Sequence, residues 1–498
     1  MAGDAKPKDL FEDVSDEWIR EHDAKHATWE TKAKLERENY ITYTDAGYEV
    51  LVQAAEAMEQ MNAFYRIFFQ FGTEEHGGSV PRIGLNIFRT RDEYLELGIG
   101  PPAEWSGGHF TGDYVETYIG SGGFQAMTGT LFHEAAHQFV SLATTATGWL
   151  NEGLASFFEG TRILPNGTVI MNMPANHRLY PLVSRMEKGW MSGPDDGTDP
   201  EDANATPETA PTFRIILENE YTWGPPWYAP TWGVVYFLYN YQDPIDGRFV
   251  YRAAFQEFID SSGGRVGNGA VKNFQEVVLA NPSSPLKGVE RPEDAPKLRL
   301  PKTVEDLDPL WKEWCTALRQ EQRGLATPQR PYKLWGRYAA ANKNYTDAQE
   351  HYEKGLVDTP DDIELLVEFA EFLNEHFENA DRAARLVLEA IHYIESNKPV
   401  DEKKLKQCER LLSKLDPKQK TLEQVQIEMA AAGRGIVQRY RAADLPLMVM
   451  DVSWRLATRQ DLPDLFEVYE QALRDSGKSL RIWDLAYNES NLEGWNSA

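Results

Sequence analysis

In the first third of the chain, segments with the hydrophobic period of helices alternate with segments that have the period of strands. Residues 1–38 are mostly polar, and their helix-forming part from residue 10 predicts an N-terminal helical extension. The segment YITYTDAGYEVLV predicts a short pair of strands around its Asp-Ala-Gly turn. Helical spacing is found in LVQAAEAMEQMNAFYRIFFQF, and a helix that ends at glycine is predicted for RTRDEYLELG. Strands are predicted for PRIGLNIF and DYVETYIG. We therefore expect a modest sheet with helices packed on it.

From about residue 129 to residue 320 the pattern is mostly helical. The amphipathic segment DPLWKEWCTALRQEQ closes this region, and the proline-rich stretch NPSSPLKGVERPEDAPKLRLP before it predicts an irregular surface connector. Together with the preceding strands, this pattern predicts an α+β domain over residues 39–325 that is predominantly helical, with a small N-terminal sheet.

Residues 329–398 contain two similar units spaced by about 34 residues. The first unit has large, small, aromatic and proline residues in the order of a helix-turn-helix repeat, at Trp335, Gly336, Ala348, Tyr352, Gly355 and Pro360. The second unit has corresponding residues at Phe369, Ala370, Ala383, Val387 and Ala390. The pattern resembles tetratricopeptide repeats, which implies a TPR-like helical solenoid over 326–480 and a protein partner for it. Residues 481–498 resemble the opening of bacterial carbohydrate-associated β-sandwich domains, so we expect a tail or the start of a further domain there.

Composition narrows the classes of function. The 498 residues are enough for several domains, and 78 acidic against 51 basic side chains give a formal charge of −27. Because such a surface repels phosphate, we expect no nucleic-acid partner. Only Cys315 and Cys408 are present, so we expect neither a disulfide framework nor a cysteine zinc finger. No apolar run approaches about eighteen residues, so no membrane insertion is expected, and the start lacks a signal-peptide core. A leader removed earlier would leave no trace, and the compartment stays open.

The stretch TLFHEAAHQFV carries the candidate chemistry. His133 and His137 are four residues apart, hence on one helical face, and Glu134 leans toward the same side. This spacing lets two imidazoles bind one metal ion while the carboxylate takes a proton from metal-bound water. Fifteen residues after His137, Glu152 in WLNEGLASFFEG adds a carboxylate, which completes a His-His-Glu set with an open position for water.

HEAAHQF followed by WLNEGLASFFE is similar to the paired motifs of gluzincin metallopeptidases such as the zinc aminopeptidases. It is most similar to the bacterial peptidase-MA-like proteins, which are often joined to tetratricopeptide repeats. The resemblance covers about residues 40–320 and implies a thermolysin-like catalytic domain. It implies that His133, His137 and Glu152 bind one Zn²⁺ and that Glu134 is the general base. Fourteen residues separate His137 from Glu152, fewer than in the aminopeptidases, which predicts a tight connection.

A donor for the oxyanion is also needed. YAPTWGVVYFL resembles the aminopeptidase helix whose leading tyrosine has this role, which makes Tyr228 the candidate. The alternative for Tyr228 is aromatic packing against Trp223, Trp227 and Trp232. The other candidate donors are Tyr221 and His177.

Three further features carry open alternatives. Glu159, two turns after Glu152, either orients a histidine or is a solvated glutamate at a helix end. WSGGHFTGDY is either an edge strand against which a peptide lies or a glycine turn. His22 and His26 are also four residues apart, but without a third ligand we expect them to be exposed on a charged helix.

Together these features predict a zinc metallopeptidase that hydrolyses peptide or protein substrates through a Glu134-activated, zinc-bound water. The sequence lacks the G-x-M-E-N segment with which aminopeptidases bind the substrate amine, which favours endopeptidase or specialised peptidase activity. One alternative is a scaffold whose TPR-like solenoid binds partners and whose zinc fold is structural, although that role does not need Glu134. A second alternative is a hydrolase of glycopeptides or modified peptides, which the C-terminal tail favours.

Overall fold

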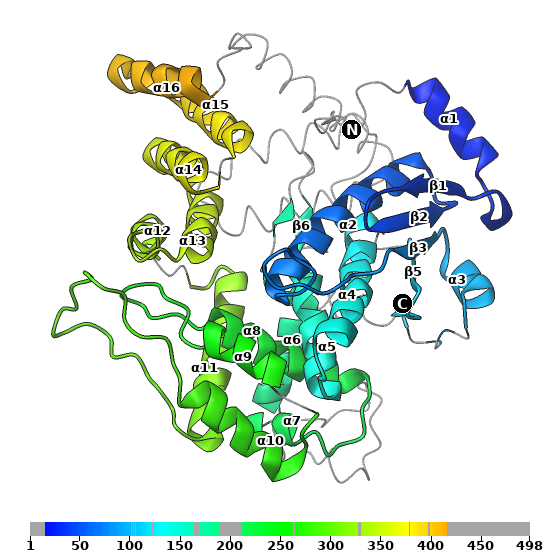
Figure 1. The fold of residues 1–498 in the computed structure, drawn as a ribbon, viewed down its shortest axis with the longest axis horizontal. Coiled ribbons are helices and arrows are strands. Elements are labelled where there is room, and N and C mark those ends of the chain that lie inside the picture. The colour runs from blue at the N-terminus through cyan, green and yellow to red at the C-terminus, as the bar shows by residue number, and fades with distance from the viewer. Residues whose placement is uncertain are drawn as a thin grey trace.

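The computed structural model describes residues 15–100, 102, 104, 106–120, 123–163, 169–170, 172–188, 212–261, 264–326, 330–377, 379–396 and 399–415. The described chain is predominantly helical with a small mixed sheet (Figure 1). The predicted tail at 481–498 and the helices expected after residue 415 lie outside the described residues. No described helix combines the length and the apolar character that crossing a membrane requires.

Five strands form the sheet in the order β1-β2-β3-β5-β4. These are β1 (Ala33–Glu36), β2 (Tyr40–Thr44), β3 (Ile83–Phe88), β4 (Gly108–Phe110) and β5 (Tyr114–Tyr118). The inner strands β2, β3 and β5 run parallel, whereas β1 and β4 pair antiparallel at the two edges. All of β3 is buried, as expected of a central parallel strand covered on both faces.

Helices cover both faces of this sheet. α2 (Tyr48–Phe68) packs against β1 and β2, and α4 (Gly123–Ala143) packs against β4 and β5. Val115 of β5 lies in the core that these helices share, whereas Tyr118 contacts Tyr94 of α3 (Arg91–Leu97). Because successive side chains of a strand point to opposite faces, α3 covers the other face. The sheet therefore fixes the position of α4, which carries both candidate histidines.

We call the sheet and the helices up to residue 322 the body. Its remaining helices are arranged around α8 (Tyr228–Asn240), which is almost completely buried. They are α5 (Gly148–Phe157), α6 (Asn176–Lys188), α7 (Phe213–Glu218), α9 (Arg252–Ser261), α10 (Gly267–Phe274) and α11 (Val304–Gln322). A two-stranded hairpin of β6 (Arg162–Ile163) and β7 (Val169–Ile170) lies between α5 and α6 in sequence. One continuous apolar core runs from the sheet to α11.

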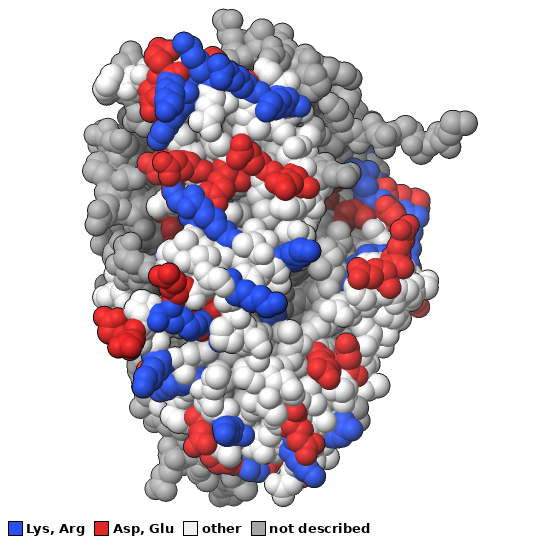
Figure 2. Space-filling view, turned by 60° about the vertical axis from the view of Figure 1, so that its left-hand side comes forward, with Lys and Arg blue, Asp and Glu red and all other residues white. Residues whose placement is uncertain are grey.

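A second core belongs to the C-terminal helices, shown in yellow to orange in Figure 1. They are α12 (Tyr332–Ala341), α13 (Tyr345–Asp358), α14 (Ile363–His376), α15 (Ala380–Ser396) and α16 (Glu402–Leu415), and they pack as successive hairpins that we call the solenoid. A side chain at Gly336 would overlap the ring of Tyr352, so two repeat positions meet where α12 crosses α13. Figure 2 shows acidic and basic side chains interspersed on the face that includes the solenoid.

Two local predictions were wrong. Among the described residues 15–38, only Asp16–Lys25 form an α-helix (α1), and β1 follows after a short 3₁₀ turn at Trp29–Thr31. The second strand expected after the Asp-Ala-Gly turn is instead the start of α2. Asp23 explains this start, because its carboxylate accepts a hydrogen bond from the Tyr48 N–H at 2.8 Å and so satisfies a free donor of the helix.

Candidate metal centre

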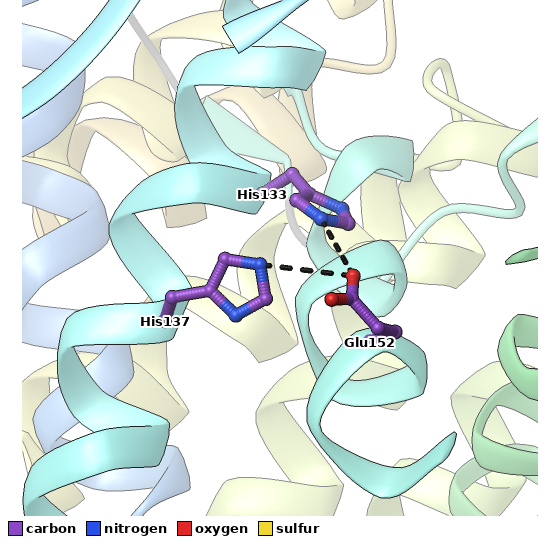
Figure 3. A group of neighbouring side chains, drawn as sticks. All are labelled: His133, His137 and Glu152. Atoms are coloured by element: carbon purple, nitrogen blue, oxygen red, sulfur yellow. Dashed lines mark ion pairs between the residues drawn. The ribbon is translucent and has the colours of Figure 1, made fainter. Parts of the chain in front are cut away.

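Both histidines lie on α4, one turn apart, with ring centroids separated by 4.9 Å (Figure 3). The helix buries its apolar side chains in the body core, among them Leu131, Phe132 and Phe139. This burial holds the helix against the sheet and α2. His133 is 5% exposed, and the side chain of His137 remains slightly more open.

Glu152 comes from α5, and only four residues separate the end of α4 from the start of α5. The predicted tight connection is therefore present. Asn219 fixes the start of α5, because its side-chain oxygen accepts a hydrogen bond from the Trp149 N–H at 3.1 Å. Gly153 allows α5 to touch α8, since a Cβ there would lie 2.9 Å from the carbonyl oxygen of Thr231. These contacts turn Glu152 toward the histidines.

The three side chains converge on one point (Figure 3). Oε2 of Glu152 lies 3.3 Å from Nε2 of His133 and 3.7 Å from Nε2 of His137. One ligand atom from each residue lies within 4.8 Å of the others, and no other such group of His, Cys, Asp or Glu occurs among the described residues. The ring centroids of His22 on α1 and of His26, the residue directly after α1, lie 4.5 Å apart. Both side chains are partly buried rather than fully exposed, and they have no third ligand in the described chain.

A second layer of hydrogen bonds orients the two imidazoles. Nδ1 of His133 donates to Oε1 of Glu159 at 2.7 Å, and Nδ1 of His137 lies 3.0 Å from Oδ1 of Asn151. These bonds leave the Nε2 atom of each ring facing Glu152. An imidazole whose Nδ1–H is donated to a fixed acceptor is the usual form of a metal-binding histidine.

Glu159 lies at the centre of this layer and is 5% exposed. It belongs to a 3₁₀ turn, Phe158–Gly160, directly after α5. Arg178 of α6 donates to both of its oxygens, at 2.7 and 2.8 Å, and Nε2 of His177 lies 2.8 Å from Oε2. Burial alone would raise the pKa of Glu159, but the guanidinium of Arg178 holds it well below its usual range. Glu159 is therefore a buried, paired carboxylate rather than a solvated one.

The charges around the point of convergence favour the binding of a cation. Burial alone would lower the pKa of His133, but Glu152 and Glu159 raise it to about 10, so the ring is protonated without a metal. Burial lowers the pKa of His137 to about 4, which leaves a lone pair on Nε2 that faces Glu152. Oε2 of Glu152 is itself buried and pairs with both rings without a well-formed hydrogen bond. Two imidazole nitrogens and one carboxylate oxygen around such a point fit a divalent cation such as zinc.

Glu134 points from α4 toward β4. A Cβ at Gly108 would lie 3.2 Å from Cγ of Glu134 and 2.7 Å from Cγ2 of Thr130, so this glycine makes room for the helix. Burial raises the pKa of Glu134 to about 7; the charge of His133 opposes this shift, and Glu152 and Glu159 add to it. A carboxylate in this range can both accept and return a proton near neutral pH.

Tyr228 is the first residue of α8 and lies beside the cluster. Its ring centroid is 5.8 Å from that of His133, and the guanidinium of Arg178 lies 4.7 Å from the ring. Trp223 meets the same ring edge-on at 5.3 Å, so Tyr228 is also part of an aromatic contact. Burial raises the pKa of Tyr228, which keeps its hydroxyl protonated.

The other two donor candidates have different surroundings. Tyr221 stacks on Trp227 with centroids 3.5 Å apart, and its hydroxyl is buried without a hydrogen-bond partner in the described chain. His177 bonds Glu159. Sequence reasoning had missed Asn151 and Arg178. Asn151 directly precedes Glu152 and was open to inference, whereas nothing in the local pattern around Arg178 indicates that it reaches Glu159.

Comparison with known proteins found no matching protein-family model, no matching curated protein and no matching solved structure. The chemistry of this centre therefore has to be inferred from its own residues.

Proposed function

We propose that this protein is a zinc-dependent metallopeptidase of the gluzincin type. The observation that carries the proposal is the convergence of His133, His137 and Glu152 on one point, with both Nδ1 atoms already bonded elsewhere. Zinc bound by these three residues would lower the pKa of a coordinated water and polarise the carbonyl of the substrate. Glu134, beside the ligands, distinguishes this arrangement from a purely structural metal site, which needs no base.

The residues of the chain would divide the remaining work. Glu134 accepts the proton of the attacking water and returns it to the leaving amine. The hydroxyl of Tyr228 donates a hydrogen bond to the oxyanion that forms at the carbonyl. Arg178 keeps Glu159 ionised, and Glu159 keeps His133 oriented.

The edge strand β4 supports a peptide as the substrate. It pairs only with β5 in the five-stranded sheet, and Gly108 brings it into contact with the helix that carries Glu134. An extended peptide could add to this edge through its backbone, which would bring a peptide bond near Glu134. Such a mode requires no free substrate terminus and therefore favours endopeptidase activity.

The proposal is tested by comparing purified wild-type protein with Glu134→Gln. Wild type should contain about one zinc per chain and should cleave an unstructured protein in a way that a chelator abolishes. Glu134→Gln should keep the zinc and lose roughly 10²- to 10⁴-fold in rate, as expected for loss of a general base. The double variant His22→Gln, His26→Gln is a matched control, because it removes a second histidine pair and should change neither property.

Full cleavage by Glu134→Gln would refute the assignment of the base. Wild-type protein that binds zinc but cleaves no member of a peptide library would instead support the scaffold alternative. Metal analysis that finds another ion in place of zinc would refute the choice of metal.

A further inference from the structure

The first hairpin of the solenoid is joined to the body by buried polar contacts. Arg252 of α9 bonds two acids of α13, Asp347 at 2.9 Å and Glu350 at 2.8 Å. Glu350 extends further into the body, where its Oε1 accepts a hydrogen bond from Nδ2 of Asn172 at 2.6 Å. Asn172 precedes Glu350 by 178 residues and belongs to the segment that leads into α6.

Asn172 occupies a backbone conformation that needs support. Its φ is 55°, in the left-handed region, where asparagine is tolerated better than most residues. Its side-chain amide forms two reciprocal hydrogen bonds with that of Asn240, at 2.8 and 2.9 Å, and its carbonyl oxygen accepts from the Tyr236 hydroxyl at 3.3 Å. Side chains of α8 and one of α13 therefore hold this residue.

The turn at Asn172 lies directly against the residue after Glu159. A Cβ at Gly160 would lie 1.7 Å from the carbonyl oxygen of Met173, so the two backbones touch and only glycine fits. Two residues after Met173, the carbonyl of Ala175 accepts the first hydrogen bonds of α6, the helix that carries Arg178. The turn thus sets the distance between Glu159 and Arg178, the two partners that hold His133.

We propose that the hairpin α12–α13 helps to position the metal site. In this proposal Glu350 is a positioning residue that acts through Asn172 on Glu159 and His133. The inference rests on the proposed function, because it takes His133 to be a metal ligand. A protein bound to the solenoid would then change the metal site whenever it shifts α13. Burial alone would raise the pKa of Glu350, but Arg252 and Lys354 hold it below the usual range, so this carboxylate is charged.

The test changes, in the full-length protein, the polarity of the two hydrogen bonds that Nδ2 of Asn172 donates to Glu350 and to Asn240. Asn172→Asp keeps the shape of the side chain but replaces this donor with an oxygen that faces both partners. Its zinc dissociation constant, measured by competition with a chelator, should rise roughly tenfold, the effect of disturbing a residue behind a metal ligand. Adding Glu350→Gln should recover part of the lost affinity, because the new amide can donate to the new carboxylate, while the change at Asn240 is common to both variants. The absorption spectrum of the cobalt-substituted protein should change and recover in parallel.

Asp347→Asn is the matched control. It removes the other carboxylate that bonds Arg252 on the same helix but leaves the bond to Asn172 intact, so zinc affinity and the cobalt spectrum should stay at wild-type values. An equal loss in this control would overturn the inference, as would wild-type affinity and spectrum in Asn172→Asp, or a double variant that fails to recover. A wild-type protein that binds zinc tightly and cleaves no peptide would refute the peptidase proposal alone, since the metal affinities would still test the role of Glu350.

Discussion

Two arginine–glutamate pairs of nearly the same geometry lie in the two parts of this molecule. In the body, Arg178 bonds both oxygens of Glu159 at 2.7 and 2.8 Å; in the solenoid, Arg337 bonds both oxygens of Glu368 at 2.7 and 2.5 Å. They differ in burial. The side chains of Glu159 and Arg178 are 5% and 24% exposed, whereas those of Glu368 and Arg337 are 24% and 51% exposed.

The same contrast runs through both cores. The body buries ionisable side chains in its interior, among them Glu116, His133, Glu159, Asp243 and Asp246. In the described part of the solenoid, the buried side chains are apolar except for His351, which stacks on Phe249 of the body. Burying polar groups costs free energy, so it is expected where function or a specific junction requires it. By this criterion a functional site is expected in the body. In the described part of the solenoid, a buried polar side chain is found only where the solenoid meets the body.

The largest effect on stability should come from Arg178→Met. This change leaves Glu159 as a buried carboxylate without its bidentate partner, and breaking such a pair typically costs about 3–5 kcal/mol. The measurement is urea denaturation of the metal-free protein at neutral pH. The difference from wild type should shrink below about pH 4, because the stabilisation from a carboxylate with a lowered pKa disappears as it takes up a proton. A loss below about 1 kcal/mol would mean that Glu159 does not depend on Arg178.

A smaller effect, dependent on pH, is expected at His351. Neither of its ring nitrogens forms a well-formed hydrogen bond among the described residues. Burial lowers its pKa to about 3; Glu350 and the backbone of Gly247 oppose this shift, while Lys354 and Arg252 add to it. The unfolded chain binds a proton at this histidine below about pH 6.5, whereas the folded chain does not. This histidine should therefore lower the stability of wild type by about 1.4 kcal/mol per pH unit below 6.5, or about 2 kcal/mol at pH 5, beside the contributions of other groups such as His137.

The variant His351→Met should remove this part of the pH dependence while retaining an apolar contact with Phe249. The free energy of unfolding at pH 7.5 and pH 5 gives the slope for each protein. His392→Met is the matched control, since this histidine of α15 is exposed and should leave the slope unchanged. Equal slopes in wild type and His351→Met would show that His351 is solvated in the folded protein.

The next effect concerns metal affinity and not stability. Asn151→Ala removes the acceptor for Nδ1 of His137, so the ring is free to turn, and zinc affinity should fall by roughly tenfold, about 1.4 kcal/mol. Asn151→Asp keeps an acceptor in the same place and should bind zinc at least as tightly as wild type. Chelator competition measures both variants. Unchanged affinity in Asn151→Ala would contradict the role given to this hydrogen bond.

The sequence was sufficient to predict the grouping of the three candidate ligands because they lie close together in it. His133 and His137 share one helix, where helical spacing puts them on one face, and the short connection to the next helix brings Glu152 beside them. Helix, strand and solenoid patterns were also clear where apolar residues repeat over two or more turns, as in α2 and in α12 to α15. Local periodicity has a physical cause there, namely one buried face per element.

The rest could not be predicted because it depends on contacts between distant segments. β1 has the sequence AKLE, which alternates but is only four residues long, too short to indicate a strand by itself, and it becomes a strand by pairing with β2. Arg178 reaches Glu159 only because Gly160 and the turn at Asn172 bring α6 beside the end of α5. For Glu159 the sequence left two readings open, and the packing around it, not its spacing, determines which partners it has.

The smallest effect is expected in the solenoid, from Arg337→Met. The guanidinium is half exposed, so water can replace it, and Glu368 keeps a hydrogen bond from the Tyr352 hydroxyl at 2.9 Å. Exposed ion pairs are typically worth less than about 1 kcal/mol, and salt screens them further. Urea denaturation of this variant should therefore differ little from wild type, and the difference should narrow further in 1 M salt, while zinc affinity stays the same. If Arg337→Met costs as much as Arg178→Met, geometry and not burial determines the strength of these pairs, and the contrast between the two parts of the molecule fails.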